Sequence, residues 1–178
     1  MDIIREALEL DPTSKTWLRW KIRPRSHFRN QHGWSIFNVL YAGKEAGNLK
    51  PPRNGKQYYS VHLGDSNYLC HRIVLALSSG SDPGELQIDH RDSNGLNNNP
   101  SNLRLATNAE NGWNRGRQRN NTSGKKGVDW HKKSNKWRAM VEINGRRKYL
   151  GLFDCIEAAA AAYDRVAREH FGEFYRPS

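Results

Sequence analysis

The chain has few cysteines, few acidic residues for its number of basic ones, and no long apolar run. Its two cysteines, Cys70 and Cys155, are too few for a four-thiolate zinc site. The N-terminus lacks the layout of a signal peptide, so both are expected to be free thiols in a reducing, cytoplasmic setting. No apolar stretch approaches the roughly 18 residues of a membrane-spanning helix. We therefore expect a protein that is neither secreted nor inserted in a membrane.

The charge that is present is strongly basic. The 178 residues include 29 Lys or Arg and 18 Asp or Glu, a net charge of +11. The segment from Arg115 to Lys148 alone holds twelve basic and two acidic residues. Such a concentration favours a binding face for a polyanion, with nucleic acid as the first expectation and an acidic membrane surface as the second.

One stretch, Ile88 to Asn111, gathers the residue types of a hydrolytic site. It contains the pair Asp89-His90, a turn rich in Asn and Gly, then Asn102 and Asn111. Carboxylate and amide oxygens suit Mg²⁺, which needs few protein ligands because it retains water and binds phosphate oxygens. A histidine beside such a ligand can act as a general base on water. The stretch therefore predicts a site for phosphodiester hydrolysis.

These residues resemble the motif of HNH endonucleases, in the form carried by phage homing endonucleases. The resemblance implies that His90 is the general base and that Asn102 braces the loop. It also implies that Asp89 and Asn111 bind one divalent ion per active site, Mg²⁺ or another such as Mn²⁺. Asn114, one helical turn further, is an alternative to Asn111 as the second ligand.

Two features near this motif have alternative interpretations. An EF-hand register with Gly95 at its sixth position places Ser101 where a bidentate Glu is required, which argues against a calcium loop. His71 lies where many members of the resembled branch have a His-Arg pair. It either contacts phosphate or is simply packed, and packing is the preferred interpretation.

The hydrophobic pattern predicts an α+β protein. Before residue 117 the expected elements are a helix over 3–10, a strand over 17–22, an irregular region over 24–57, strands over 58–63 and 67–69, a helix over 71–77, short strands at 86–88 and around Leu103 and Leu105, and a helix capped by Thr107 and Glu110. Two strand ends and a helix start then converge in the ββα-metal arrangement that the resemblance implies.

The C-terminal part predicts a separate small domain. After a basic linker over 117–126, strands are expected at 128–130, 137–143 and 147–150, with a hairpin turn at Asn144-Gly145. A helix with five consecutive alanines is expected over 156–171. The pattern around Trp137-Arg138-Ala139, Tyr149 to Phe153 and Phe171 to Phe174 resembles the plant ethylene-response-factor (apetala-type) DNA-binding domain.

That second resemblance implies that the helix-free face of a three-stranded sheet contacts DNA. Strand alternation places Trp137 and Leu150 toward the helix. Asp129 stands at an outward position that is usually basic in the plant domains. The expected DNA-binding residues are Lys126, Lys136, Arg138, Arg147 and Tyr149.

The expected organisation is a nuclease domain over 1–116 with its core motif at 58–116, the linker, and the DNA-binding domain over 127–178. The expected function is that of a metal-dependent DNA endonuclease of homing type, encoded by a phage and acting in the host cytoplasm. Its partner is double-stranded DNA, with dimerisation on DNA possible and the choice between nick and double-strand break open. The alternative is a DNA-binding regulator with a degenerate nuclease scaffold; RNA binding is disfavoured because no aromatic platform is evident.

Overall fold

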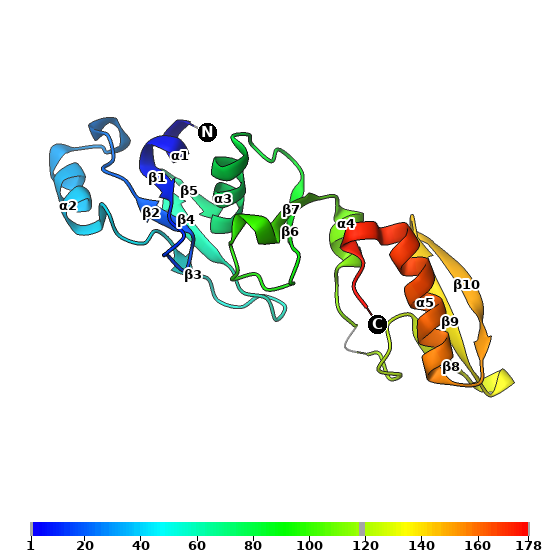
Figure 1. Ribbon diagram of the computed structural model, residues 1–178. Coiled ribbons are helices and arrows are strands. Elements are labelled where there is room, and N and C mark those ends of the chain that lie inside the picture. Colours follow the sequence, from blue (N-terminus) through cyan, green and yellow to red (C-terminus); the bar gives the residue numbers. More distant parts are fainter. Residues whose placement is uncertain (1, 118–119, 178) are drawn as a thin grey trace. The chain divides into compact units, whose positions relative to one another are not determined.

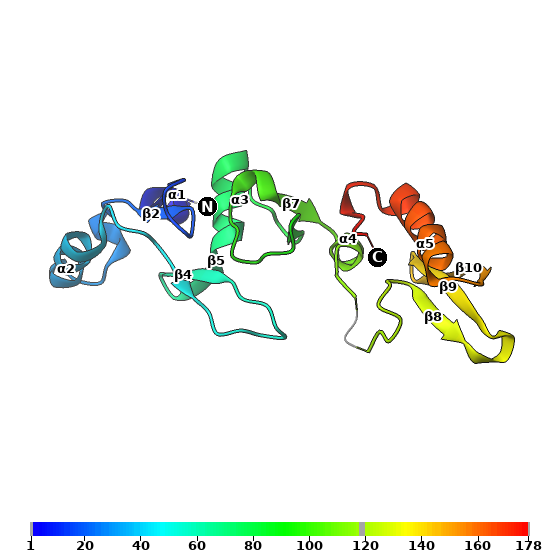
Figure 2. The same cartoon turned by 60° about the horizontal axis from the view of Figure 1, so that its bottom comes forward.

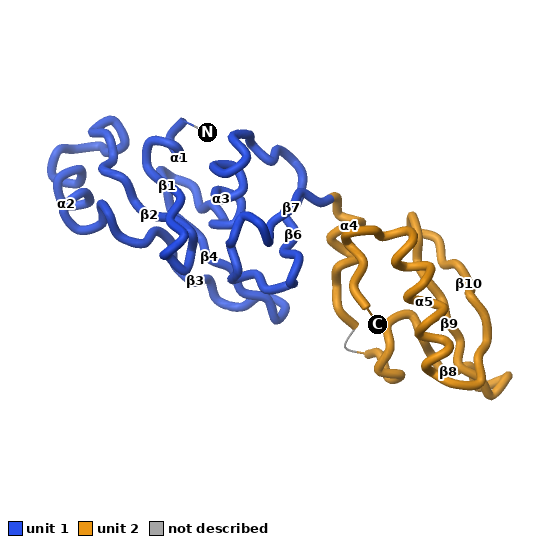
Figure 3. Tube along the Cα trace, in the orientation of Figure 1, with its two compact units in different colours: residues 1–106 blue, residues 107–178 orange. Residues whose placement is uncertain are grey.

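A computed structural model describes residues 2–117 and 120–177 (Figure 1). Residues 118 and 119, in the expected linker, lie outside the described residues. Residues up to Ala106 form one compact unit and residues from Thr107 onward form a second (Figure 3). This division precedes the boundary expected at residue 116, so the helix that follows Thr107 belongs to the second unit. No helix within the described ranges is long and apolar enough to cross a membrane.

The first unit is built from three small antiparallel sheets and three helices. The sheets pair β1 with β2, β3 with β4 and β5, and β6 with β7. The elements are α1 (Asp2–Ala7), β1 (Leu8–Leu10), β2 (Leu18–Trp20), α2 (Gln31–Tyr41), β3 (Asn48–Leu49), β4 (Tyr59–Leu63), β5 (Ser66–Leu69), α3 (Cys70–Ser79), β6 (Gln87–His90) and β7 (Leu103–Ala106), with 3₁₀ turns at Arg25–His27 and Pro100–Asn102.

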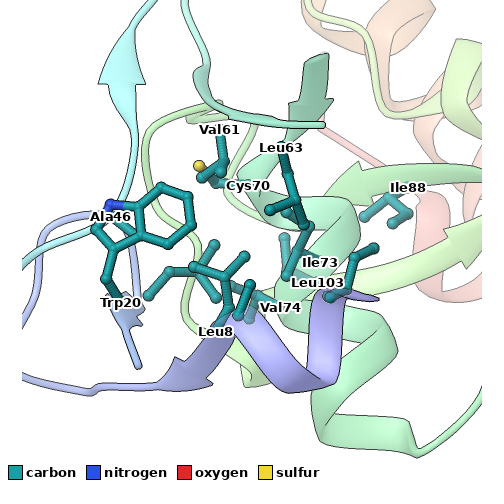
Figure 4. Packing of buried hydrophobic residues seen from close by; sticks show 13 residues of the cluster. Leu8, Trp20, Ala46, Val61, Leu63, Cys70, Ile73, Val74, Ile88 and Leu103 are labelled. Carbon is teal, nitrogen blue, oxygen red and sulfur yellow. The ribbon is translucent and has the colours of Figure 1, made fainter. Parts of the chain in front are cut away.

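A single apolar cluster joins these elements (Figure 4). Val61 and Leu63 of β4 pack with Ile73 and Val74 of α3, and all four are almost completely buried. Ile88 and Leu103 extend the cluster into β6 and β7. The apolar residue of each strand is thus anchored in the core, which fixes the position of the polar residues that follow Ile88.

Two predictions for the N-terminal region are wrong. The first helix ends at Ala7 rather than at residue 10, because Leu8 to Leu10 pair with β2 instead. The region expected to be irregular contains the eleven-residue helix α2. Asn30 caps this helix by accepting a hydrogen bond from the N–H of Gly33 at 2.7 Å, and Phe37 packs edge-on against Trp20 with ring centroids 5.0 Å apart.

The other strands and helices predicted for this unit are confirmed. The strands at β4 and β5 form the expected hairpin, and α3 covers the predicted helix and ends before Gly80, which has a left-handed φ of 75°. The two short strands form the antiparallel pair β6 and β7.

The second unit contains a three-stranded sheet covered by one long helix, as predicted. Its elements are α4 (Asn108–Trp113), β8 (Val128–His131), β9 (Lys136–Ile143), β10 (Arg146–Phe153) and α5 (Ile156–Phe171), with 3₁₀ turns at Lys132–Ser134 and Gly172–Phe174. The antiparallel strands follow the order β10-β9-β8. Asn144 and Gly145 form the expected tight turn with φ values of 51° and 72°.

Small residues bring α5 close to this sheet. Ala159 and Ala160 of the helix pack against Val128 and Ala139 of the strands, and all four are buried. At the other end, a Cβ on Gly127 would lie 2.1 Å from the ring of Tyr163, so only glycine fits beneath that ring. The fold class predicted from the sequence, α+β with a small three-stranded sheet and one helix at the C-terminal end, is confirmed.

Candidate functional site

The pair Asp89-His90 lies at the end of β6, immediately after the core residue Ile88. Both side chains are buried, each with only 5% of its surface exposed. The ladder with β7 places Asp89 opposite Arg104 and His90 opposite Leu103. Since Ile88 of β6 and Leu103 of β7 are held in the core, the strand pair presents this carboxylate and imidazole from a fixed backbone.

Arg104 is the direct partner of Asp89. Its Nε and Nη2 donate hydrogen bonds to Oδ2 of Asp89 at 2.9 and 2.6 Å, and both side chains are 6% exposed. Charge-assisted hydrogen bonds of this kind are strong and orient both groups. These hydrogen bonds fix the orientation of the Asp89 carboxylate. Its main partner is therefore Arg104 and not solvent. Arg104 was not predicted as a site residue, because only the strand register brings it to Asp89.

Asn102 braces the loop between β6 and β7. Its Nδ2 donates to Oδ1 of Asp92 at 3.0 Å and to the carbonyl of Asn97 at 2.9 Å. Its Oδ1 accepts the N–H of Asp92 at 3.1 Å, and its own carbonyl accepts the N–H of Arg91 at 2.9 Å. One buried amide thus holds both ends of the loop that follows His90.

Aromatic rings surround His90. The ring of His71 meets it edge-on, with centroids 5.0 Å apart and planes at 89°, and the ring of Tyr58 lies 6.0 Å away. Burial lowers the pKa of His71 to about 3, with the nearby charges of His90 and Arg72 adding to the effect. His71 is thus a neutral, buried ring against the candidate base, which favours the packed interpretation over a phosphate contact.

The electrostatic surroundings of His90 favour its neutral form. Burial lowers the pKa of His90 below its ordinary value, and the positive charge of Lys56 acts in the same direction. Asn98, Asp92 and Asp89 oppose this shift without reversing it. A base must be unprotonated to accept a proton, so a lowered pKa keeps His90 ready at neutral pH. Lys56 and Tyr58 lie in a segment that the motif spacing did not single out, whereas Asn98 belongs to the Asn-rich turn of the motif itself.

The candidate ligand Asn111 and its alternative Asn114 lie on and after α4, in the second unit. Thr107 accepts the N–H of Glu110 at 3.3 Å, and Glu110 accepts the N–H of Thr107 at 2.7 Å, so the predicted capping box is confirmed. Asn111 lies within the first helical turns and is half-buried, whereas Asn114 is the C-cap and is buried. The structure therefore groups Asp89, His90 and Asn102 in one unit and both asparagines in the other.

Four of the five predicted DNA-binding residues, Lys136, Arg138, Arg147 and Tyr149, share the helix-free face of the sheet in the second unit. The register pairs Arg138 with Asp129, Arg147 with Glu142, and Tyr149 with Met140. Trp137 and Leu150 instead pack with the buried cluster under α5, as predicted. Tyr149 is 59% exposed on the outer face.

Acidic residues on that face pair with its basic ones. Arg138 donates to the two carboxylate oxygens of Asp129 at 3.1 and 2.7 Å. Lys136 lies 3.0 Å from Asp154, and Arg147 lies 3.8 Å from Glu142. These pairs are partly or largely exposed, so they contribute little to stability. These pairs instead orient the basic side chains. The effect is strongest for Arg138, which makes two hydrogen bonds to Asp129.

Lys126 differs from the other predicted DNA-binding residues. Its ammonium group donates to the carbonyl of Trp113 at 2.7 Å. Burial lowers its pKa from the ordinary value, with the charge of Arg176 adding to the effect. Lys126 is thus engaged within the protein at the C-terminal end of α4, where a cation also complements the helix dipole.

Two domain families match the chain. The model described as HNH endonuclease matches residues 68–113, and the model described as AP2 domain matches residues 123–173. Protein 3.8 of Escherichia phage T7 is 40% identical over 106 residues, which make up 60% of this chain and 87% of the phage protein. The chain belongs to the HNH endonuclease family. A relative from Acanthamoeba polyphaga mimivirus, named "Uncharacterized HNH endonuclease L560", is 37% identical over 125 residues, 70% of this chain and 64% of that protein.

No solved structure matches the chain. The family matches confirm both resemblances: an HNH nuclease domain is joined to a DNA-binding AP2 domain. The HNH match spans β6, β7 and α4, and therefore includes Asp89, His90, Asn102 and Asn111. The AP2 match covers the sheet of the second unit and its helix α5.

HNH nucleases generally depend on a divalent metal ion. Within residues 2–117 and 120–177, no three His, Cys, Asp or Glu side chains cluster as a metal site. The donors expected from the resemblance to the HNH motif are of another kind, the Asp89 carboxylate and an asparagine amide. Both supply hard oxygen atoms, and an ion that retains water and binds phosphate needs few protein ligands. The buried carboxylate of Asp89, oriented by Arg104, fits such an ion.

Proposed function

We propose that this protein is a metal-dependent DNA endonuclease of homing type that hydrolyses a phosphodiester bond with His90 as general base. The observation that carries the proposal is the buried Asp89-His90 pair at the end of β6, followed by a loop that Asn102 holds in place. The phage origin of one relative supports the homing type and action in a host cytoplasm.

In this proposal His90 accepts a proton from the attacking water. Its lowered pKa leaves the imidazole neutral at physiological pH, so it is able to take that proton. His71 and Tyr58 restrict the ring by packing against it. Asn102 keeps the loop after His90 in one conformation, which prevents the base from moving away from its water.

Asp89 and Asn111 would hold the divalent ion, for which we propose Mg²⁺, with Mn²⁺ as a substitute. Such an ion would stabilise the charge that develops on the phosphate and the leaving oxygen. Arg104 holds the Asp89 carboxylate in place from β7. Asn114, the buried C-cap of α4, is the alternative second ligand.

The AP2 domain would direct cleavage by binding DNA with the outer face of its sheet. Lys136, Arg138, Arg147 and Tyr149 lie on this face. Arg138 is the strongest candidate for a base contact, because a guanidinium held by a carboxylate presents its other N–H groups in a defined direction. Lys126 would contribute positive charge near α4 and would not contact a base, since its ammonium group is bound to the carbonyl of Trp113.

Each chain carries one such site, so a single encounter is expected to cut one strand. Two chains acting on opposite strands, including a dimer formed on DNA, would produce a double-strand break. Incubation of supercoiled plasmid with the protein and Mg²⁺ tests the function: nicked circles should appear, and EDTA should prevent their formation. Tight DNA binding without any cleavage in Mg²⁺ or Mn²⁺ would instead identify a non-catalytic DNA-binding protein.

A further inference from the structure

The strand pair β3 and β4 continues beyond its ladder into a hairpin with a basic tip. Asn48 pairs with Ser60 and Leu49 with Tyr59, and the N–H of Lys50 donates to the carbonyl of Tyr58 at 2.9 Å. Arg53 and Lys56 then form a bridge with reciprocal backbone hydrogen bonds of 2.9 and 3.0 Å. The two residues between them, Asn54 and Gly55, have φ values of 52° and 74°. Residues 48–60 are called the basic hairpin below.

The charge of the basic hairpin is entirely positive. Lys50, Arg53 and Lys56 are exposed, and residues 46–64 contain no Asp or Glu. In the part of the chain that the structure describes, none of these three side chains forms a salt bridge or a side-chain hydrogen bond. Other cations of both units, such as the half-buried Arg19 and Arg138, are paired with acids. Three unpaired cations on one rigid turn favour an anionic partner.

The basic hairpin lies beside the loop that follows His90. A Cβ on Gly95 would lie 2.4 Å from the carbonyl oxygen of Gln57 and 2.7 Å from the ring of Tyr58, so the two segments touch. Tyr58 in turn packs against His90, and the charge of Lys56 is felt at the His90 ring. Figure 1 shows the turn after β3 next to the loop between β6 and β7, and Figure 2 gives a second view of both segments.

We propose that the basic hairpin binds the phosphate backbone of double-stranded DNA next to the bond that is cut. This inference rests on the proposed nuclease function, because the phosphodiester at His90 determines which polyanion lies here. Neighbouring phosphates of one strand follow every 3.4 Å along the helix axis, so a strand placed at His90 brings further phosphates within reach of adjacent side chains. Of the three cations, Lys56 is the one whose charge affects the pKa of His90. Arg53 lies opposite Lys56 across the turn.

The nuclease domain thereby holds DNA itself, in addition to the AP2 domain. Phosphate contacts fix register and orientation without reading bases. The basic hairpin would therefore bind a duplex of any sequence at the active site. Sequence preference would come from the AP2 domain. Rigidity matters for this role, since a turn held by two backbone hydrogen bonds positions the backbone more precisely than a mobile loop.

The test uses full-length protein carrying His90→Ala, so that DNA is bound without being cut. Arg53→Gln/Lys56→Gln is compared with Lys15→Gln/Lys44→Gln, which removes two exposed lysines beside Glu45 in the same unit. Affinity for a duplex is measured over a series of salt concentrations. Each lost phosphate contact lowers the salt slope by about 0.9. The hairpin variant should lose close to two phosphate contacts and bind the duplex on the order of tenfold more weakly at 0.1 M salt. The control variant should keep both the salt slope and the affinity of the His90→Ala protein.

A second measurement places the contact. Asn54→Cys in a Cys155→Ser background carries a tethered iron chelate that cuts DNA near the hairpin tip. Its cuts should lie within a few base pairs of the nick made by the wild-type enzyme. An unchanged salt slope in the hairpin variant, or tethered cuts a helical turn or more from the nick, would overturn the proposal. If the wild type proves not to cut at all, a reduced salt slope still identifies a DNA contact, and the nuclease assignment alone fails.

Discussion

The guanidinium of Arg104 donates two hydrogen bonds to a single oxygen of Asp89, at 2.9 and 2.6 Å, with both side chains buried. The pair is set by strand register, because β6 and β7 place the two residues directly opposite each other. A candidate metal ligand is thus part of a buried ion pair. Replacing either partner alone changes stability as well as chemistry.

We therefore expect Arg104→Met to destabilise the first unit by about 3–5 kcal/mol, the usual cost of leaving a buried charge without its partner. Asp89→Asn/Arg104→Met should recover much of that loss, since no buried charge remains, yet should not cut DNA. Urea unfolding and plasmid cleavage measure the two effects separately. Equal stability of Arg104→Met and wild type would show that the pair is not needed to hold β6 and β7 together.

A second prediction concerns α4, which has only six residues and needs external support. Trp113 stacks on Phe171 of α5, with ring centroids 4.7 Å apart and planes at 16°, and its carbonyl accepts the ammonium of Lys126. The helix that carries Asn111 is thus anchored within the AP2-containing unit. Trp113→Ala should reduce cleavage and raise the Mg²⁺ concentration required, because Asn111 loses its support.

Trp130→Ala is the matched control, since Trp130 is exposed in the same unit and meets the ring of Trp137 edge-on, with centroids 5.0 Å apart. It should leave the Mg²⁺ requirement unchanged. A chain ending at residue 118 would lack Phe171, so it should lose the order of α4 and cut poorly even at low salt. Full activity of that truncated chain would show that α4 folds without the AP2 domain.

The pH dependence of cleavage follows from His90. Burial holds its pKa below the ordinary value of 6.5, and the base works only when neutral. The single-turnover rate should therefore rise with pH, pass its midpoint below 6.5 and be level at neutral pH. Because Lys56 lowers the pKa of His90, Lys56→Gln should move the midpoint upward. Lys50→Gln, a change in the same hairpin, should not. A downward shift in Lys56→Gln, measured at saturating DNA, would contradict this assignment.

Asp129 is predicted to set the orientation of Arg138 on the AP2 sheet. Arg138→Ala should cost about 1–3 kcal/mol in binding and relax sequence preference at one position. Asp129→Asn removes a negative charge and frees the guanidinium, so it should strengthen binding to unrelated DNA and broaden the cleavage-site map. Glu157→Gln, an exposed change on α5, is the control that should leave the map unaltered.

Local signals in the sequence predicted local structure well. The capping box of Thr107 and Glu110 and the turn at Asn144-Gly145 depend on neighbouring residues, and both are confirmed. The alanine-rich helix is found over its predicted range as α5. The motif of Asp89, His90 and Asn102 also lies within fourteen residues, so its spacing was enough to single it out.

Features that depend on distant residues were missed. Leu8 to Leu10 were assigned to a helix, although their pairing with Leu18 to Trp20 makes them a strand. Helix α2 was overlooked because its stabilising contacts, such as Phe37 with Trp20, come from outside its own segment. The role of Arg104 as the partner of Asp89 was not predicted for the same reason, since only the register of β6 and β7 places the two residues opposite each other.

His90 is proposed to act as the general base in the hydrolysis of a phosphodiester. The most direct test compares His90→Ala with the wild type in single-turnover cleavage of a duplex in Mg²⁺, with DNA affinity measured in parallel. General bases typically contribute 10²–10⁴ in rate, so the variant should cut at roughly a hundredth of the wild-type rate or less and bind DNA within a few-fold of the wild type. Cleavage by a correctly folded His90→Ala protein at a rate close to that of the wild type would contradict the assignment.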